Sequence, residues 1–360
     1  MEKLEASALC ATGIESIVIP QKITSIEKGL FYCCEKLKNV SIPEGVTTIG
    51  EAAFYECELL ENIKLPKSLK VIRNYAFQSC RHLKSVVIPK GTIEIQKQVF
   101  SHCNMLEDVV LPKSVKTIDE AAFKNTKWIK KQKYKNRMLI LNGILLDGTK
   151  CEGKVKIPKT VRSISGGAFK NNKKITEVII PKSVEDIGEM AFFQCTQLEK
   201  VKISGPLETL RAGVFYYCKN LKNITLPNTI KYICSWYICA LSEVREDDLF
   251  GAFEGCSKLE EIRLPKELLK TETAAFRGCE NLKSIIIPKK VRELGMNTFC
   301  ACSKLKNITV KTKKIDKNSE SCFESISKYA IIKVPKSKIR DYKKIWKKNI
   351  AKTVKIQIGK

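Results

Sequence analysis

A proline recurs every 23 residues through most of this chain, and a phenylalanine recurs with the same period. The phased prolines are Pro20, Pro43, Pro66, Pro89, Pro112, Pro158, Pro181, Pro227, Pro265 and Pro288. The gaps are 23, 46 where one proline is missing, and 38 between Pro227 and Pro265, which is one period plus 15 residues. A fixed period of this length predicts a solenoid of stacked units. Solenoids present surfaces, so the period favours binding over catalysis.

Residues 60–83 show how one unit folds. Leu60, Ile63 and Leu65 are apolar with polar residues between the last pair, which predicts a half-buried strand ended by Pro66. From Ala76 to Leu83 the apolar residues have helical spacing, which predicts one face of a short helix. Because a single unit cannot bury these side chains, we expect stacked units with a parallel sheet on the concave side and short helices or turns opposite.

These residues resemble a leucine-rich repeat of the BspA-like type, whose pattern is xx[LI]xx[IV]x[IL]Pxx[VL]xxIxxxAFxxC. The resemblance covers Ile14 to about Val310. It implies a non-enzymatic recognition or adhesion protein of bacterial cell surfaces, either cell-surface or secreted. Commoner leucine-rich repeats hold an asparagine ladder after the strand, whereas this chain has Gly or Ser there.

We expect a solenoid over residues 1–310 and a lysine-rich capping unit over 311–360. Within the solenoid, residues 124–157 look like a variant repeat of the family, with a hairpin turn at Asn142-Gly143. Residues 234–249 are an insertion. In the capping unit we expect a last strand ending at Val334-Pro335 and a helix that carries Tyr342 and Trp346.

The formal charge of the 360-residue chain is +27, and residues 311–360 hold 16 basic against 4 acidic side chains. A basic surface suggests a polyanionic partner such as an acidic glycan, although lysine can also serve only as the solubilising residue. No apolar run is long enough to cross a membrane, and no signal peptide is visible.

Nine of the 16 cysteines lie three residues after the repeat phenylalanine: Cys34, Cys57, Cys80, Cys103, Cys195, Cys218, Cys256, Cys279 and Cys302. A residue fixed to the repeat phase is a packing position, so we expect a ladder of free, buried thiols. Such a ladder fits a reducing setting.

The sequence offers no catalytic, cofactor or metal site. It has two histidines, His82 and His102, and no CxxC, P-loop, GxGxxG, GxSxG or HExxH motif. We therefore expect no enzyme activity, no cofactor and no sequence-specific nucleic-acid binding, and we expect a monomer.

The outward strand positions form the predicted binding surface, with contacts from Asn62, Lys64, Val87, Asp108 and Val110. Val87 and Val110 are neighbours in the stack and apolar on an exposed face. They form either a contact patch or a β-branched pair that stabilises the sheet.

The insertion adds Trp236 and Tyr237 to the predicted contacts and carries several acidic residues. It either binds a partner or folds back onto its own basic body.

Taken together, the residues and the resemblance predict a protein or glycan partner bound through the solenoid surface. The alternative is a cytoplasmic protein-interaction scaffold, favoured by the free thiols and the missing signal peptide.

Overall fold

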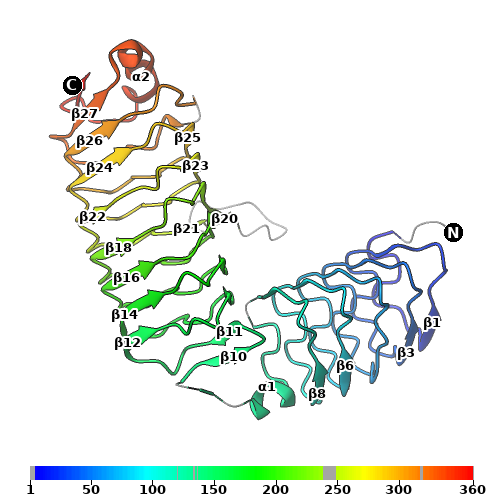
Figure 1. The fold of residues 1–360 in the computed structure, drawn as a ribbon. Helices are drawn as coiled ribbons and strands as arrows, with labels where there is room; N and C mark the ends of the chain where they lie inside the picture. Colours follow the sequence, from blue (N-terminus) through cyan, green and yellow to red (C-terminus); the bar gives the residue numbers. More distant parts are fainter. Residues whose placement is uncertain are drawn as a thin grey trace. The chain divides into compact units, whose positions relative to one another are not determined.

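The computed structural model describes residues 5–119, 121–132, 134–135, 137–237, 249–316 and 319–359. The chain forms two compact units. Unit 1 comprises Met1–Lys135 and Leu139–Leu146, and unit 2 comprises Asn136–Met138 and Asp147–Lys360. Each unit is a stack of turns with two strand layers; Figure 1 colours the chain from blue at the N-terminus, in unit 1, to red at the C-terminus, in unit 2.

In unit 1 the first strand layer holds β1 (Ser16–Val18), β3 (Asn39–Ser41), β6 (Ser85–Val87) and β8 (Asp108–Val110). The second layer is one sheet of two-residue strands: β2 (Ser25–Ile26), β4 (Thr48–Ile49), β5 (Val71–Ile72), β7 (Glu94–Ile95) and β9 (Thr117–Ile118). The stack is followed by α1 (Lys127–Lys131), β10 (Leu139–Leu141) and β11 (Ile144–Asp147).

In unit 2 the first layer consists of two sheets. The first is β12 (Gly153–Lys156), β14 (Ile175–Ile180), β16 (Lys200–Ile203), β18 (Asn223–Thr225) and β22 (Glu261–Ile262). The second is β24 (Ser284–Ile287), β26 (Asn307–Val310), β27 (Ile331–Val334) and β28 (Lys355–Ile358). The opposite layer holds β13 (Ser163–Ile164), β15 (Asp186–Ile187), β17 (Thr209–Leu210), β19 (Tyr232–Ile233), β23 (Lys270–Thr271) and β25 (Glu293–Leu294).

The strand pairs between successive turns of the stack are parallel, and their register reproduces the sequence period. Ser16 lies beside Asn39, and Lys200 lies beside Asn223, each 23 residues apart. Asn223 pairs with Glu261, so the 15 extra residues leave the stack in phase. The solenoid predicted from the period is therefore confirmed.

The predicted short helix at residues 76–83 is wrong, because this arc of each unit is a chain of turns. Tyr75 and Ser79 have φ angles of 61° and 62°, which no α-helix contains. The N–H groups of Tyr75, Phe77 and Ser79 donate to carbonyls of the following repeat, so they cannot close helical bonds. The sequence reading also missed the second strand layer, whose two-residue strands are too short to show alternation.

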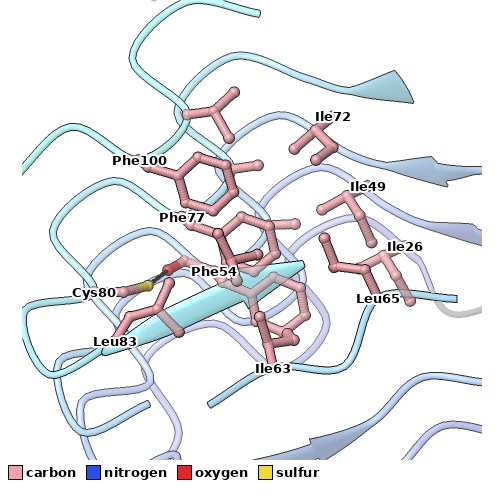
Figure 2. Close-up of a cluster of buried hydrophobic side chains, with 14 of the residues drawn as sticks. Ile26, Ile49, Phe54, Ile63, Leu65, Ile72, Phe77, Cys80, Leu83 and Phe100 are labelled. Carbon is pink, nitrogen blue, oxygen red and sulfur yellow. Dashed lines mark hydrogen bonds between the residues drawn. The ribbon is translucent and has the colours of Figure 1, made fainter. Parts of the chain in front are cut away.

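The core is a column of phenylalanine rings between the two layers. Phe54, Phe77 and Phe100 stack with centroids 5.0 and 5.4 Å apart and planes within 2° (Figure 2). All three side chains are fully buried. In unit 2 the column runs from Phe169 through Phe192, Phe215, Phe253, Phe276 and Phe299 to Phe323.

The phased cysteines form a hydrogen-bonded ladder beside this column. The Cys80 thiol donates to the Phe54 carbonyl at 3.1 Å, from one turn of the stack to the preceding turn (Figure 2). The same bond, with sulfur to oxygen distances of 3.0–3.3 Å, links Cys57, Cys103, Cys195, Cys218, Cys256, Cys279 and Cys302 to their phenylalanine carbonyls. The ladder thus supplies a side-chain to backbone hydrogen bond between neighbouring turns of the stack.

All fifteen cysteines in the described part of the chain are free thiols, including the nine of the predicted ladder, and eleven are buried. Cys239 lies outside the described residues. Cys10 is exposed, whereas desolvation raises the pKa of half-buried Cys33 to about 11.

We expect the eleven buried thiols to resist alkylation in the native protein at pH 8, with Cys10 reacting first. A thiol-reactive dye should count all sixteen after denaturation without reductant, and a shortfall would reveal disulfides.

Asn142 and Gly143 join β10 to β11, which are hydrogen-bonded neighbours. Both residues have positive φ angles, 49° and 75°, as a two-residue hairpin turn requires. The hairpin predicted from this dipeptide is therefore present.

The end of unit 2 contains a strand that the sequence reading missed. The predicted last strand is β27, and it is followed by a 3-10 turn, η3 (Lys336–Lys338), and α2 (Ile339–Trp346). β27 is not the last strand, however, because β28 pairs with it in parallel register. Val354, Ile356 and Ile358 alternate with polar residues, and this is the signal that identifies the extra strand.

Candidate functional site

The outward side of the first strand layer, here called the strand face, is built by the strict alternation of strand side chains. Two outward residues per turn form two rows that cross the strands. Between them, buried residues such as Val86 anchor each strand to the core. The short strands are locked into the stack by their register, so this face is a rigid surface.

The structure places five of the predicted contact residues together on the strand face of unit 1. Asn62 bridges to Ser85, and Ser85 pairs with Asp108, so this row is polar. Val87 pairs with Val110, and their side chains are 60% and 57% exposed. Lys64 is exposed in the same row as the valines.

The insertion begins and ends in an antiparallel stem of β20 (Ser235–Tyr237) and β21 (Leu249–Gly251). The main chains of Trp236 and Tyr237 lie in β20, while their side chains and residues 238–248 fall outside the described residues. Phe250 in β21 packs edge-on against Phe193 and Tyr216, with centroids 5.8 and 4.9 Å away. This aromatic cluster anchors the stem to the body.

The repeated acidic residues of the sequence lie in ion-paired columns. Glu61, at the position before the outward row, accepts from Lys84 of the next repeat at 2.7 Å. Glu260 and Lys283 form the same contact, and in both cases the lysine holds the glutamate pKa below its ordinary value. In these pairs the glutamate and the lysine of the next repeat neutralise each other within the stack.

A groove of about 950 Å³ opens on the strand face of unit 2. It lies over β18, β22 and β24, where the first-layer sheet that ends at β22 meets the sheet that begins at β24. Its floor is formed by outward-facing residues, which include Asn223, Thr225, Ser284 and the half-exposed Ile286. Its basic residues are Arg263, Lys266, Lys289, Lys290 and Lys311.

Sequence reasoning identified the outward rows of this groove but not its cationic wall. Lys266 and Lys289 directly follow the repeat prolines, a position that is also lysine in other turns. Lys311 stands where the period would place the next proline. Because the first position after the proline is lysine in many turns, only Lys311 distinguishes this region in the sequence.

Within the described residues, no three His, Cys, Asp or Glu side chains are grouped so that they could hold a metal ion. The described helices include none that is both long and apolar enough to span a bilayer.

The model of the "BspA type Leucine rich repeat region" matches this chain in six copies, over residues 2–130, 148–245 and 250–357. The chain belongs to the BspA-type leucine-rich repeat family. This family consists of non-catalytic repeat proteins, and membership points to a role in protein interaction.

The solved structures similar to this BspA-type chain include leucine-rich repeat proteins from bacteria. A leucine-rich repeat protein from Bacteroides ovatus is 21% identical, with 99% of this chain and 87% of that chain covered and a TM-score of 0.42. A leucine-rich cell surface protein from Faecalibacterium prausnitzii is 25% identical over 85% and 82% of the chains (TM-score 0.37). The pneumococcal vaccine antigen PcpA is 19% identical over 96% and 79% (TM-score 0.41). No curated protein matches the BspA-type chain.

Proposed function

We propose that this BspA-type protein is a non-enzymatic recognition protein that binds a macromolecular partner through its strand face at a bacterial cell surface. The observation that carries the proposal is the exposed Val87–Val110 pair, which lies in register on a rigid sheet. An apolar pair that the sheet leaves in water gains stability when a partner covers it. Asn62, Lys64 and Asp108 form its polar rim.

The partner of this patch is a protein, because apolar contacts surrounded by a polar rim are typical of protein interfaces. The immobilised chain should capture it from host matrix proteins or from surface extracts of other cells. Val87→Asp with Val110→Asp should weaken binding at least tenfold, because a carboxylate buried without a partner is costly. Affinity should change little between 50 and 200 mM salt, since few charges take part.

Ile93→Asp is the matched control, because Ile93 is 46% exposed but lies outside the strand face, next to β7. It should leave affinity within about twofold. Circular dichroism of all variants checks the fold. A captured partner that is indifferent to the valine substitutions would rule out the patch as its contact.

A second candidate function is an intracellular interaction scaffold, and the free thiols favour it. Secreted proteins form disulfides in oxidising surroundings, whereas every described cysteine here is free. Protease treatment of intact producing cells separates the two: a surface protein is cleaved and an intracellular one is protected.

We also propose that residues 311–360 form the capping unit of the solenoid. Trp346 packs edge-on against Phe323, the last ring of the column, and donates from Nε1 to the Ser319 carbonyl at 3.0 Å. The buried Tyr342 hydroxyl donates to the Thr312 carbonyl at 3.0 Å. These contacts cover an end of the core that would otherwise meet water.

A further inference from the structure

We propose that the groove over β18, β22 and β24 binds an acidic polysaccharide, a linear glycan with carboxylates or sulfates repeated along its length. The inference rests on the proposed recognition function and assigns a ligand class to a second part of the strand face. It is carried by the charges of the groove, by the chemistry of its floor and by the repeat spacing.

The groove holds an excess of cations that the protein itself does not neutralise. Among the described residues, no carboxylate lies within ion-pair distance of four of its basic side chains: Arg263, Lys266, Lys289 and Lys311. Of the two acids in the groove, Glu267 pairs with Lys290 at 2.5 Å. The other, Glu261, lies near Lys283, whose pKa is raised mainly by Glu260 and further by Glu261. Basic side chains gathered in a concave site attract anions.

The floor of the groove suits a polymer rich in hydroxyl groups. Asn223, Thr225 and Ser284 point outward with short amide and hydroxyl side chains. Ile224, Ile262 and Ile285 also line the groove although their side chains are buried, so they contribute main-chain atoms. Ile286, which is 52% exposed, offers an apolar surface to the face of a sugar ring.

The spacing of the cations favours a linear polyanion laid along the stack. Lys266 and Lys289 occupy the same phase of adjacent turns, about 4.8 Å apart at the usual strand spacing. A sugar unit of an extended glycan spans a similar distance, so anionic groups on every unit meet successive turns, and carboxylates on alternate units meet every second turn. An acidic peptide fits less well, because peptide recognition relies on a free strand edge or on side-chain pockets. β18 is paired on both sides, by β16 and β22. At the junction of the two sheets the Lys283 N–H donates to the Glu260 carbonyl at 3.2 Å, so β22 and β24 already lie against each other.

The test measures binding of a hyaluronan oligosaccharide and a heparin oligosaccharide to the full chain by calorimetry. Hyaluronan carries carboxylates and heparin adds sulfates, so the two arms identify the anionic group. We expect both or one to bind, with affinity falling about twentyfold between 50 and 200 mM salt for three neutralised charges. Neutral dextran should not bind.

Arg263→Ala, Lys266→Ala and Lys289→Ala together should weaken glycan binding at least tenfold. The matched control is Lys64→Ala, Lys67→Ala and Lys90→Ala, which removes three charges at the same repeat phases in unit 1. The control triple should change affinity less than about threefold. All six side chains are exposed, so circular dichroism should show both triples folded.

Three outcomes would overturn the inference. Equal losses in the two triples would indicate a general lysine effect, and tighter binding of poly-glutamate would indicate an acidic peptide. The inference is also overturned if neither glycan binds. In that last case, a protein partner that still depends on Val87 and Val110 leaves the proposed function standing.

Discussion

Raising the pH from 9 to 11 should unfold this protein, because its core is built on thiols that cannot ionise in place. Desolvation raises the pKa of eight buried cysteines above the ordinary value. That of Cys151 is raised to about 11, and the other seven are Cys57, Cys80, Cys218, Cys256, Cys279, Cys302 and Cys322. In the unfolded chain the same thiols ionise near pH 8.5.

A raised folded pKa contributes stability below the unfolded pKa, and this contribution is lost as the pH rises toward the folded value. Each such thiol lowers the free energy of unfolding by about 1.4 kcal/mol per pH unit above pH 9. The seven thiols besides Cys151 lower it by about 10 kcal/mol per pH unit, which compares with about 5–15 kcal/mol for a whole domain.

Urea unfolding followed by circular dichroism at pH 7.5, 9, 10 and 10.5 measures this loss. Cys218→Ala with Cys256→Ala is the control, because it removes two ionisable groups from the ladder. That variant should start less stable but lose about 3 kcal/mol less per pH unit. A urea midpoint that stays constant up to pH 10.5 would show that the thiols ionise without opening the core.

Phe169→Ala should destabilise unit 2 by about 3–5 kcal/mol, since it removes a fully buried ring. Phe169 begins the aromatic column of unit 2. Its ring stacks on Phe192 at 4.8 Å on one side, and Gly148 lies on the other side. A Cβ atom at Gly148 would lie 2.1 Å from Cε1 of Phe169, so the glycine makes room for the ring.

A double-mutant cycle can measure the coupling free energy between Gly148 and Phe169. Gly148→Ala alone should cost about 1–3 kcal/mol through overpacking, but it should be nearly neutral once Phe169 is alanine. Hydrogen exchange should show the loosening near residues 148–192, because coupling in a stack passes between neighbours. Phe276→Ala, with rings on both sides, is the control and should cost at least as much. Additive costs at Gly148 and Phe169 would contradict the packing described.

The repeat period predicted the stacking, the register and the buried column, because those features depend on side chains at fixed phases. It did not predict the turn arc. There the apolar spacing of Ala76, Phe77 and Cys80 imitates a helix, whereas Tyr75 and Ser79 adopt positive φ and bond across repeats. The cysteine ladder was predicted as packing, and only the geometry revealed its hydrogen bonds to phenylalanine carbonyls.

The candidate site was predicted in part for a related reason. Outward strand positions follow from alternation, so the exposure of Val87 and Val110 was evident from the sequence. The groove depends on loops after the prolines, where Lys266 and Lys289 meet Lys311 from a later turn. A repeat pattern does not indicate how deep the groove is, or which of its charged side chains form ion pairs.

The alternating glutamate and lysine columns restrict how an array like this can change in length. From Glu15 through Lys38, Glu61 and Lys84, the sign of the charge reverses at every repeat, and the lysines contact the glutamate before them. Loss of a single repeat by recombination would bring two lysines or two glutamates together, whereas loss of two repeats would restore the pairing. Each exposed ion pair contributes only about 0.2–1 kcal/mol to the free energy of unfolding. The two like charges, however, would face each other at the new junction between repeats. Descendants of this gene should therefore gain and lose their repeats more readily in twos.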